Sequence, residues 1–175
     1  IGVHGTHMVQ NALLALAAGL EMGVPLEKGV KGLAKARLVG GRLEQKTIAG
    51  VIYLDDTYNA SPASFKAAID VLATQKGLRI VVGGDMGELG SLETAGHREV
   101  GAYARAKGIE HFYATGTLMK EALAAFGAGA VHAADCAALA ALLQPLLGNN
   151  VSVLVKGSRS AGMERVAQLL MDIGD

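Results

Sequence analysis

Polar side chains gather directly after four apolar runs in the second part of the chain, and their types suit the binding of small charged ligands. The four polar segments are residues 55–59, 85–88, 115–117 and 156–160. In an open parallel sheet, ligands bind at the carboxyl ends of the strands. If the four apolar runs are parallel strands, these segments meet at one edge of the sheet and form the candidate site.

The last of these segments favours an anion. It offers two cations and two hydroxyl groups just before a predicted helix, namely Lys156, Ser158, Arg159 and Ser160. A helix N-terminus adds free N–H groups and the positive end of the helix dipole, which favour a carboxylate or a phosphate. The alternative is a serine N-cap with solvated basic neighbours. A Walker A loop is excluded, because no Lys-Ser or Lys-Thr pair follows Gly162.

The second segment belongs to a glycine-rich loop, GGDMGELG, at residues 83–90. Its glycines do not have the G-x-G-x-x-G spacing of a dinucleotide site. Asp85 and Glu88 are of the type that orients an amine or a metal ion. The alternative is an acidic turn before a helix.

Asp55 and Asp56 are adjacent carboxylates at the end of a predicted strand. Mutual repulsion makes such a pair costly unless a cation or a hydroxyl group lies nearby. Asn59 and Ser61, in contrast, fit an ordinary turn before a helix that begins at Pro62. The turn does not explain the two carboxylates, which therefore indicate a further partner.

Metal and thiol chemistry find little support in the sequence. None of the five histidines has HExxH spacing, and the single cysteine, Cys136, excludes an internal disulfide and a multi-cysteine zinc site. We expect His97 to be structural or solvated and Cys136 to be a buried structural thiol. No metal site is predicted in this chain.

Charge and hydropathy exclude several other classes. Lys+Arg and Asp+Glu both number 16, so no basic face for nucleic acid and no polybasic membrane anchor are expected. No apolar run approaches the ~18 residues of a membrane span. The most apolar stretch, residues 12–20, lacks the charged flank of a signal peptide. A cytoplasmic location is the expectation.

Strands alternate with helices after Gly40, which predicts an α/β fold with a mostly parallel sheet and helices on both faces. An Ala49-Gly50 turn predicts a hairpin that adds one antiparallel edge strand. The expected strands are residues 45–48, 51–54, 79–82, 111–114, 130–132 and 151–155. The expected helices are residues 11–21, 26–35, 62–74, 91–107, 117–126, 135–143 and 162–171. The first two helices precede every strand, so we infer that residues 1–40 are the tail of another domain.

Five segments resemble the bacterial Mur ligases. The strings are GTHMVQNALLALAAGLEMGV, GGRLE, DDTYNASPASFKAAIDVLA, VVGGDMGELG followed by His97, and VLVKGSRSAGMERV. They occur in the family's order and cover nearly the whole chain, so the resemblance is specific.

This resemblance implies a three-domain, ATP-dependent, peptide-bond-forming ligase of peptidoglycan precursor synthesis. Residues 1–40 would be the end of its central ATPase domain and residues 41–175 its C-terminal, Rossmann-like domain. The implied substrates are D-alanyl-D-alanine and UDP-N-acetylmuramoyl-tripeptide, which are joined through an acyl phosphate. ATP and Mg²⁺ are the implied cofactors, with the magnesium ligands mainly in the central domain.

Carried over to this sequence, the resemblance assigns ATP contacts to Asn11, Arg42 and Asp56. The residues that match positions facing the incoming dipeptide are Tyr58, Asn59, Asp85, Glu88, Lys156, Ser158 and Arg159. It assigns no catalytic residue to this chain, which is expected to bind dipeptide and part of ATP but to be inactive alone. The two N-terminal helices are expected to pack on a neighbouring chain or to be poorly ordered. The alternative is a stand-alone small-molecule-binding α/β module without catalysis.

Overall fold

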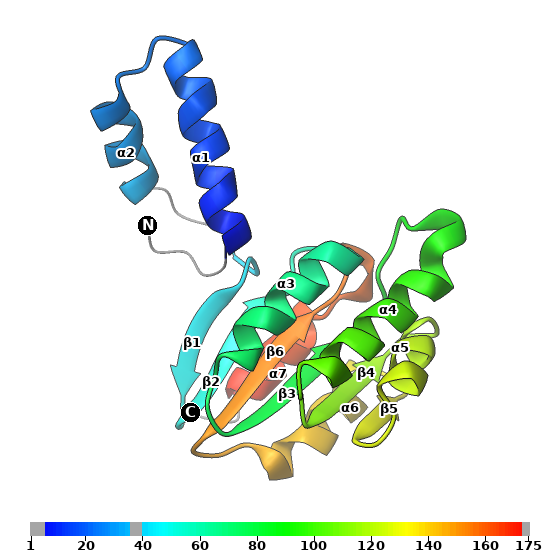
Figure 1. Cartoon of the computed structure of the whole chain (residues 1–175). Coiled ribbons are helices and arrows are strands. Elements are labelled where there is room, and N and C mark those ends of the chain that lie inside the picture. The colour runs from blue at the N-terminus through cyan, green and yellow to red at the C-terminus, as the bar shows by residue number, and fades with distance from the viewer. Residues whose placement is uncertain (1–5, 36–39, 173–175) are drawn as a thin grey trace. The chain divides into compact units, whose positions relative to one another are not determined.

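The computed structural model describes residues 6–35 and 40–172, with side chains described for residues 9–35 and 40–170 (Figure 1). The chain divides into two compact units, residues 1–39 and 40–175. This division falls close to the boundary expected from the sequence. Parts of the expected N-terminal segment, residues 1–5 and 36–39, lie outside the described residues. That this segment comes from an ATPase domain stays a prediction.

The first unit is a pair of helices, α1 (Thr6–Glu21) and α2 (Leu26–Lys35). The bounds of α2 are those predicted, whereas α1 begins five residues earlier than expected. Between them, Gly23 has a φ of +80°, which glycine adopts without strain. A Cβ atom at Gly29 would lie 2.9 Å from the Leu16 side chain, so glycine lets the two helices pack closely.

The second unit contains a six-stranded sheet in the order β1-β2-β6-β3-β4-β5. The strands are β1 (Glu44–Ile48), β2 (Val51–Asp56), β3 (Leu78–Gly83), β4 (His111–Thr115), β5 (Ala130–Ala133) and β6 (Val151–Lys156). Strand β1 is antiparallel to β2, and the other pairs are parallel. Ala49 and Gly50 join β1 to β2 with φ values of 49° and 81°, as a tight hairpin turn requires. The predicted α/β fold with an antiparallel edge is confirmed.

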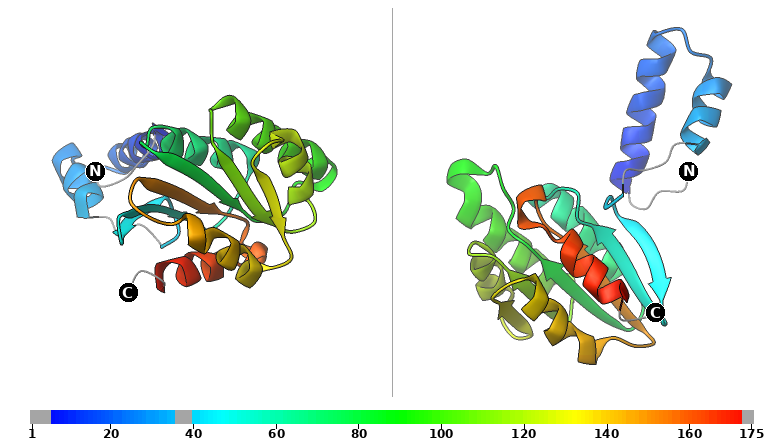
Figure 2. Two further views of the ribbon diagram at one scale, coloured as in Figure 1. Left: turned by 90° about the horizontal axis from the view of Figure 1, so that it is seen from below. Right: turned by 180° about the vertical axis from the view of Figure 1, so that it is seen from behind.

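Helices cover both faces of this sheet (Figure 2). One face carries α3 (Pro62–Ala73), α4 (Glu93–Ala106) and α5 (Met119–Phe126), and the other carries α6 (Cys136–Leu143) and α7 (Glu164–Asp172). Both faces are covered because crossover connections between parallel strands are right-handed. The chain moves outward from β2 through β3 and β4 to β5 with its helices on one face, and then returns to β6 across the opposite face. Short 3₁₀ segments lie at Gly90–Leu92, Gln144–Leu146 and Arg159–Ala161.

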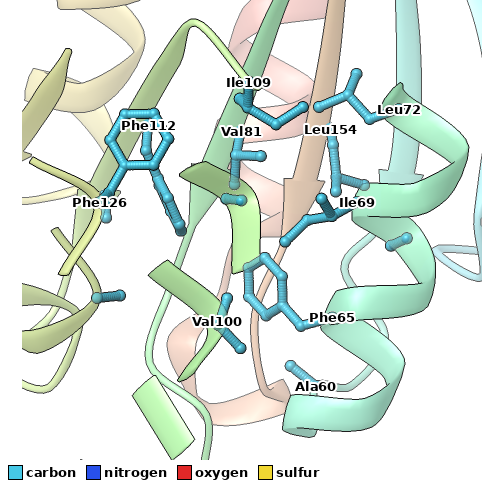
Figure 3. Packing of buried hydrophobic residues seen from close by; sticks show 14 of the residues in the cluster. Ala60, Phe65, Ile69, Leu72, Val81, Val100, Ile109, Phe112, Phe126 and Leu154 are labelled. Carbon is cyan, nitrogen blue, oxygen red and sulfur yellow. The ribbon is translucent and has the colours of Figure 1, made fainter. Parts of the chain in front are cut away.

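Each face has its own apolar core. Under α3 and α4, Phe65, Ile69, Val100 and Leu154 are buried together (Figure 3). Under α6 and α7, the core includes Leu139, Val153 and Leu170. Among the described helices, none is both long and apolar enough to cross a bilayer.

Candidate functional site

All four polar segments meet at the carboxyl edge of the sheet, as the sequence predicts. The last residues of the neighbouring strands β2, β6 and β3 are in register, with Lys156 between Asp56 and Gly83. Strand β4 ends beside them at Thr115. The edge therefore places two charged residues, Asp56 and Lys156, side by side, followed by Gly83 and Thr115.

Lys156 lies inside the domain, with a side chain that is only 1% exposed. Its Nζ donates hydrogen bonds to Asp56 Oδ2 (2.5 Å) and to the carbonyl oxygen of Asn59 (2.9 Å). Burial lowers the pKa of Lys156, Asp56 acts in the opposite direction, and the positive charge of Arg42 adds to the lowering. This burial does not support the predicted contact between Lys156 and the dipeptide.

The two adjacent carboxylates have separate partners. Asp55 Oδ1 accepts hydrogen bonds from the Thr57 hydroxyl (2.7 Å) and the Thr57 amide (3.2 Å), whereas Asp56 faces Lys156. Successive side chains of a strand point to opposite faces of the sheet, which separates the two carboxylates. The partners inferred from the sequence are thus a hydroxyl group for Asp55 and a cation for Asp56.

The linker that leads into β1 lies beside the loop after β2. The Tyr58 amide donates to the Gly41 carbonyl oxygen (2.9 Å), and the Arg42 guanidinium lies 4.2 Å from the centre of the Tyr58 ring. The structure thus brings Arg42 near Asp56 and Tyr58. The Asn59 side chain is exposed, and its Oδ1 accepts from the Ala60 amide (2.8 Å).

Asp85, in the loop after β3, forms hydrogen bonds with the loops after β4 and β6. Its Oδ1 accepts from the Met119 amide (2.8 Å) at the start of α5. Its carbonyl oxygen accepts from the Ser158 amide (3.0 Å) and the Ser158 hydroxyl (2.6 Å). Ser158 is itself buried. A Cβ atom at Gly116 would lie 2.3 Å from the Asp85 carboxylate, so the close approach of these loops requires glycine there.

Three other predicted site residues have exposed side chains. Asn11 lies on α1 of the first unit, Glu88 lies in the β3–α4 loop, and Arg159 opens the 3₁₀ segment after β6. Within the described part of the chain, the Arg159 guanidinium has no hydrogen-bond or ion-pair partner.

His97 forms a hydrogen bond with the backbone of the glycine-rich loop. Its side chain is fully buried, its Nε2 accepts from the Met86 amide (2.9 Å), and its Nδ1 lies 2.6 Å from the Glu93 carbonyl oxygen. An accepting Nε2 requires a neutral ring whose Nδ1–H donates to Glu93. His97 is therefore a structural residue that fixes the segment beside Asp85.

A cavity of about 610 Å³ opens beside these loops, on the face of the sheet that carries α6 and α7. It lies where the chain leaves β4 toward one face and β5 toward the other, which is the crevice expected in an open α/β sheet. Its lining residues are Asp85, Thr115, Gly116, Ala134, Asp135, Cys136, Ala137, Ser160, Ala161, Arg165 and Leu169. The volume is typical of a small-molecule site.

The charges around this cavity favour a ligand with both signs of charge. Thr115 is only 9% exposed, and within the described residues its hydroxyl has no hydrogen-bond partner. Arg165 supplies a cation, while Asp85 and Asp135 supply carboxylates. Cys136 lines the cavity and is only partly buried, so it is not the buried structural thiol expected from the sequence; this partial burial raises the pKa of its thiol, although Arg165 acts in the opposite direction. The sequence did not predict Arg165 or Asp135 as ligand contacts, because Asp135, which caps α6, and Arg165, which lies in α7, are brought together only by the fold.

Within the described residues, no group of three or more His, Cys, Asp or Glu side chains is placed to hold a metal ion.

Comparisons with known proteins give one consistent family. The Mur ligase, glutamate ligase domain matches residues 41–159. The UDP-N-acetylmuramoyl-tripeptide–D-alanyl-D-alanine ligase of Escherichia coli K12 is 40% identical over 173 residues, which are 97% of this chain and 38% of that protein. The chain thus spans well under half the length of this curated relative.

Two solved structures resemble the whole chain. MurF from Acinetobacter baumannii matches with a TM-score of 0.87 and 36% identity, covering 98% of this chain and 39% of that one. MurF ligase from Thermotoga maritima, solved in complex with ADP, matches with a TM-score of 0.82 and 26% identity over the same shares.

Proposed function

The chain belongs to the Mur ligase family, and from this premise we propose that it is the C-terminal part of an ATP-dependent ligase. The ligase joins D-alanyl-D-alanine to UDP-N-acetylmuramoyl-tripeptide in peptidoglycan precursor synthesis. The observation that carries this proposal is the 40% identity over 97% of the chain to a ligase of that name. The carboxyl edge of the sheet supports this proposal, because charged side chains lie there beside a cavity of suitable size.

The dipeptide occupies the cavity at the ends of β4 and β5 in this proposal. D-alanyl-D-alanine carries a carboxylate and an ammonium group, which match a site with one guanidinium and two carboxylates. Arg165 binds the carboxylate, and the unpartnered Thr115 hydroxyl donates to it. Asp135 and the second oxygen of Asp85 lie in the same cavity for the amine.

The residues assigned to ATP fit that role in part. Arg42 is an exposed cation beside the linker, and Asp56 keeps lone pairs on both oxygens beyond the hydrogen bonds it already accepts. ATP supplies the activation of the tripeptide carboxylate as an acyl phosphate. The dipeptide amine then forms the new amide bond, phosphate leaves, and the amine loses a proton. Mg²⁺ is part of the proposal as the partner of ATP, with ligands outside this chain.

The binding half of the proposal is tested on the 175-residue chain. We expect D-alanyl-D-alanine to shift the amide NMR signals of Thr115, Gly116 and Ala137. Thr115→Val and Arg165→Gln should weaken this binding about tenfold each, since each removes one polar contact to a charged group. Arg98→Gln, which alters an exposed arginine paired with Glu121 on other helices, is the control and should bind normally.

The ligase half is tested on the full-length protein that contains this sequence. Dipeptide-dependent phosphate release from ATP, with the UDP-tripeptide present, is the expected activity. Binding of the dipeptide without any such activity in the full-length protein would favour the stand-alone binding module instead. Normal binding by Arg165→Gln and Thr115→Val would place the dipeptide outside this cavity.

A further inference from the structure

Lys156, Asp56 and the linker at residues 40–43 form one connected cluster. Asp56 Oδ2 accepts from Lys156 Nζ, and Asp56 Oδ1 accepts from the Leu43 amide at 2.9 Å. Lys156 Nζ also donates to the Asn59 carbonyl oxygen at 2.9 Å. The buried Lys156 ammonium thus binds the Asp56 carboxylate and the Asn59 carbonyl oxygen directly, and it connects to the linker through Asp56.

Independent features show that this cluster fixes the linker. Leu43 is 3% exposed and packs in the apolar core under α3, although its φ of 51° is unusual for a leucine. Such a conformation persists only where the surroundings determine it. The Asp56 carboxylate, which accepts the Leu43 amide hydrogen, is one of those determinants.

The Arg42 side chain lies beside this cluster, close enough for its charge to act on Lys156. Arg42 follows Gly41, whose carbonyl oxygen accepts from the Tyr58 amide, and its guanidinium stacks on the Tyr58 ring. Charges alternate along the group, with Arg42 and Lys156 as cations and Asp56 as the anion. Without Lys156, Asp56 would be free to turn toward Arg42 and leave the Leu43 amide.

We propose that Lys156 is a positioning residue that acts on the nucleotide half of the reaction, by holding Asp56 and through it the linker that carries Arg42. It does not contact the dipeptide. The inference rests on the proposed function for the roles of Arg42 and Asp56 toward ATP. The structural part of the inference is that the Leu43 hydrogen bond depends on Lys156, and this part does not depend on the proposed function.

The first test measures hydrogen exchange at the Leu43 amide in the 175-residue chain. Lys156→Met removes the ammonium and keeps an unbranched side chain, and the Leu43 amide should then exchange about tenfold faster, as expected for the loss of one hydrogen bond. Lys107→Met removes an exposed lysine that pairs with Asp70 and should leave that rate unchanged. Wild-type protection of Leu43 in Lys156→Met would overturn the proposal.

A second variant keeps the test decisive if Lys156→Met does not fold. The double variant Asp56→Asn with Lys156→Met removes both charges, so no buried charge is left unpaired. Its Leu43 amide should exchange as fast as that of Asp56→Asn alone, because Lys156 acts only through Asp56. A further acceleration on adding Lys156→Met would show a separate role for Lys156 and overturn the proposal.

The second test compares the two substrates in the full-length ligase. Lys156→Met should raise the KM for ATP several-fold and leave the KM for D-alanyl-D-alanine unchanged. A rise confined to the dipeptide would make Lys156 a dipeptide contact, and an unchanged KM for both would make its role merely structural. Either result overturns the proposal. A wild-type protein without ligase activity would instead refute the proposed function and leave the exchange result standing.

Discussion

At the scale of single residues, two buried serines differ in whether their hydroxyl groups have partners. Ser152 is the second residue of β6, and its Oγ has no hydrogen-bond partner among the described residues. Ser158 lies just after the same strand, and its Oγ donates to the Asp85 carbonyl oxygen. A buried polar group without a partner costs free energy, whereas a paired one contributes to stability.

We therefore expect opposite effects of the same substitution at these two positions. Ser152→Ala should raise the free energy of unfolding by about 1 kcal/mol, because it removes an unsatisfied hydroxyl. Ser158→Ala should lower it by about 1 kcal/mol, because it removes a hydrogen bond between two loops. Urea unfolding of the chain and both variants measures this, and a destabilised Ser152→Ala would show that its hydroxyl has a partner after all.

At the scale of elements, a bidentate ion pair joins the start of β3 to the segment before β4. Arg79 donates to Glu110 through Nε (3.1 Å) and Nη2 (2.5 Å), and Glu110 also accepts the Arg79 amide (2.9 Å). Burial would raise the pKa of Glu110, but the hydrogen bonds from Arg79 outweigh it, and the pKa lies below its usual range. The charged form of Glu110 is thus favoured in the folded state.

The sign of the resulting pH dependence follows from this lowered pKa. A group with a lower pKa in the folded state contributes stability above its unfolded pKa and loses it as the pH falls through the folded value. Glu110→Gln should therefore cost at most about 1 kcal/mol at neutral pH, since the pair is partly exposed. This difference from the wild type should shrink on acidification below about pH 4.

Thermal unfolding of both proteins between neutral and acidic pH measures the effect. Glu121→Gln, which alters a pair with Arg98 on exposed helix surfaces, serves as the control. A stability difference for Glu110→Gln that stays constant down to acidic pH would contradict the assignment.

The sequence predicted the elements better than it predicted the side chains between them. Strand and helix positions follow from local periodicity, and Asp135 is of the residue type that caps helices, with its Oδ1 accepting from the Ala138 amide at the start of α6. The burial of Lys156 was not predictable in this way, because its partner Asp56 lies 100 residues away in the sequence. The cavity at Thr115 likewise depends on loops that only the strand order brings together.

At the scale of the whole molecule, the first unit has a strongly apolar surface. In α1, Leu13 is 60% and Leu14 is 69% exposed, and Met22 after it is 84% exposed. An apolar groove of about 280 Å³ also runs between α1 and α2. Contiguous exposed apolar surface of this kind marks interaction sites or aggregation.

We expect the 175-residue chain to self-associate as its concentration rises. The double substitution Leu13→Gln and Leu14→Gln should weaken this association, because it removes apolar area from the exposed face of α1. Leu92→Gln, at an equally exposed leucine of the second unit, should leave it unchanged. Sedimentation equilibrium measures the association, and a wild-type chain that stays monomeric at all concentrations would contradict the expectation.

By itself, this chain lacks a sequence signature for holding the phosphates of ATP. No G-x-x-x-x-G-K-[ST] loop occurs in its 175 residues, and that loop is what holds the phosphates of ATP in proteins that carry it. Ligation also needs the activated carboxylate and the dipeptide amine held together, which replaces a slow encounter with an effective concentration of about 10⁵ M or more.

The cavity described above holds at most one of the two reactants, so the chain alone should bind D-alanyl-D-alanine yet release no phosphate from ATP. A coupled phosphate assay with ATP, UDP-tripeptide and dipeptide tests this, with the full-length protein as the positive control. Sustained turnover by the purified chain would mean that its residues contain a complete nucleotide site. It would contradict the proposal that this chain supplies only part of the ATP site.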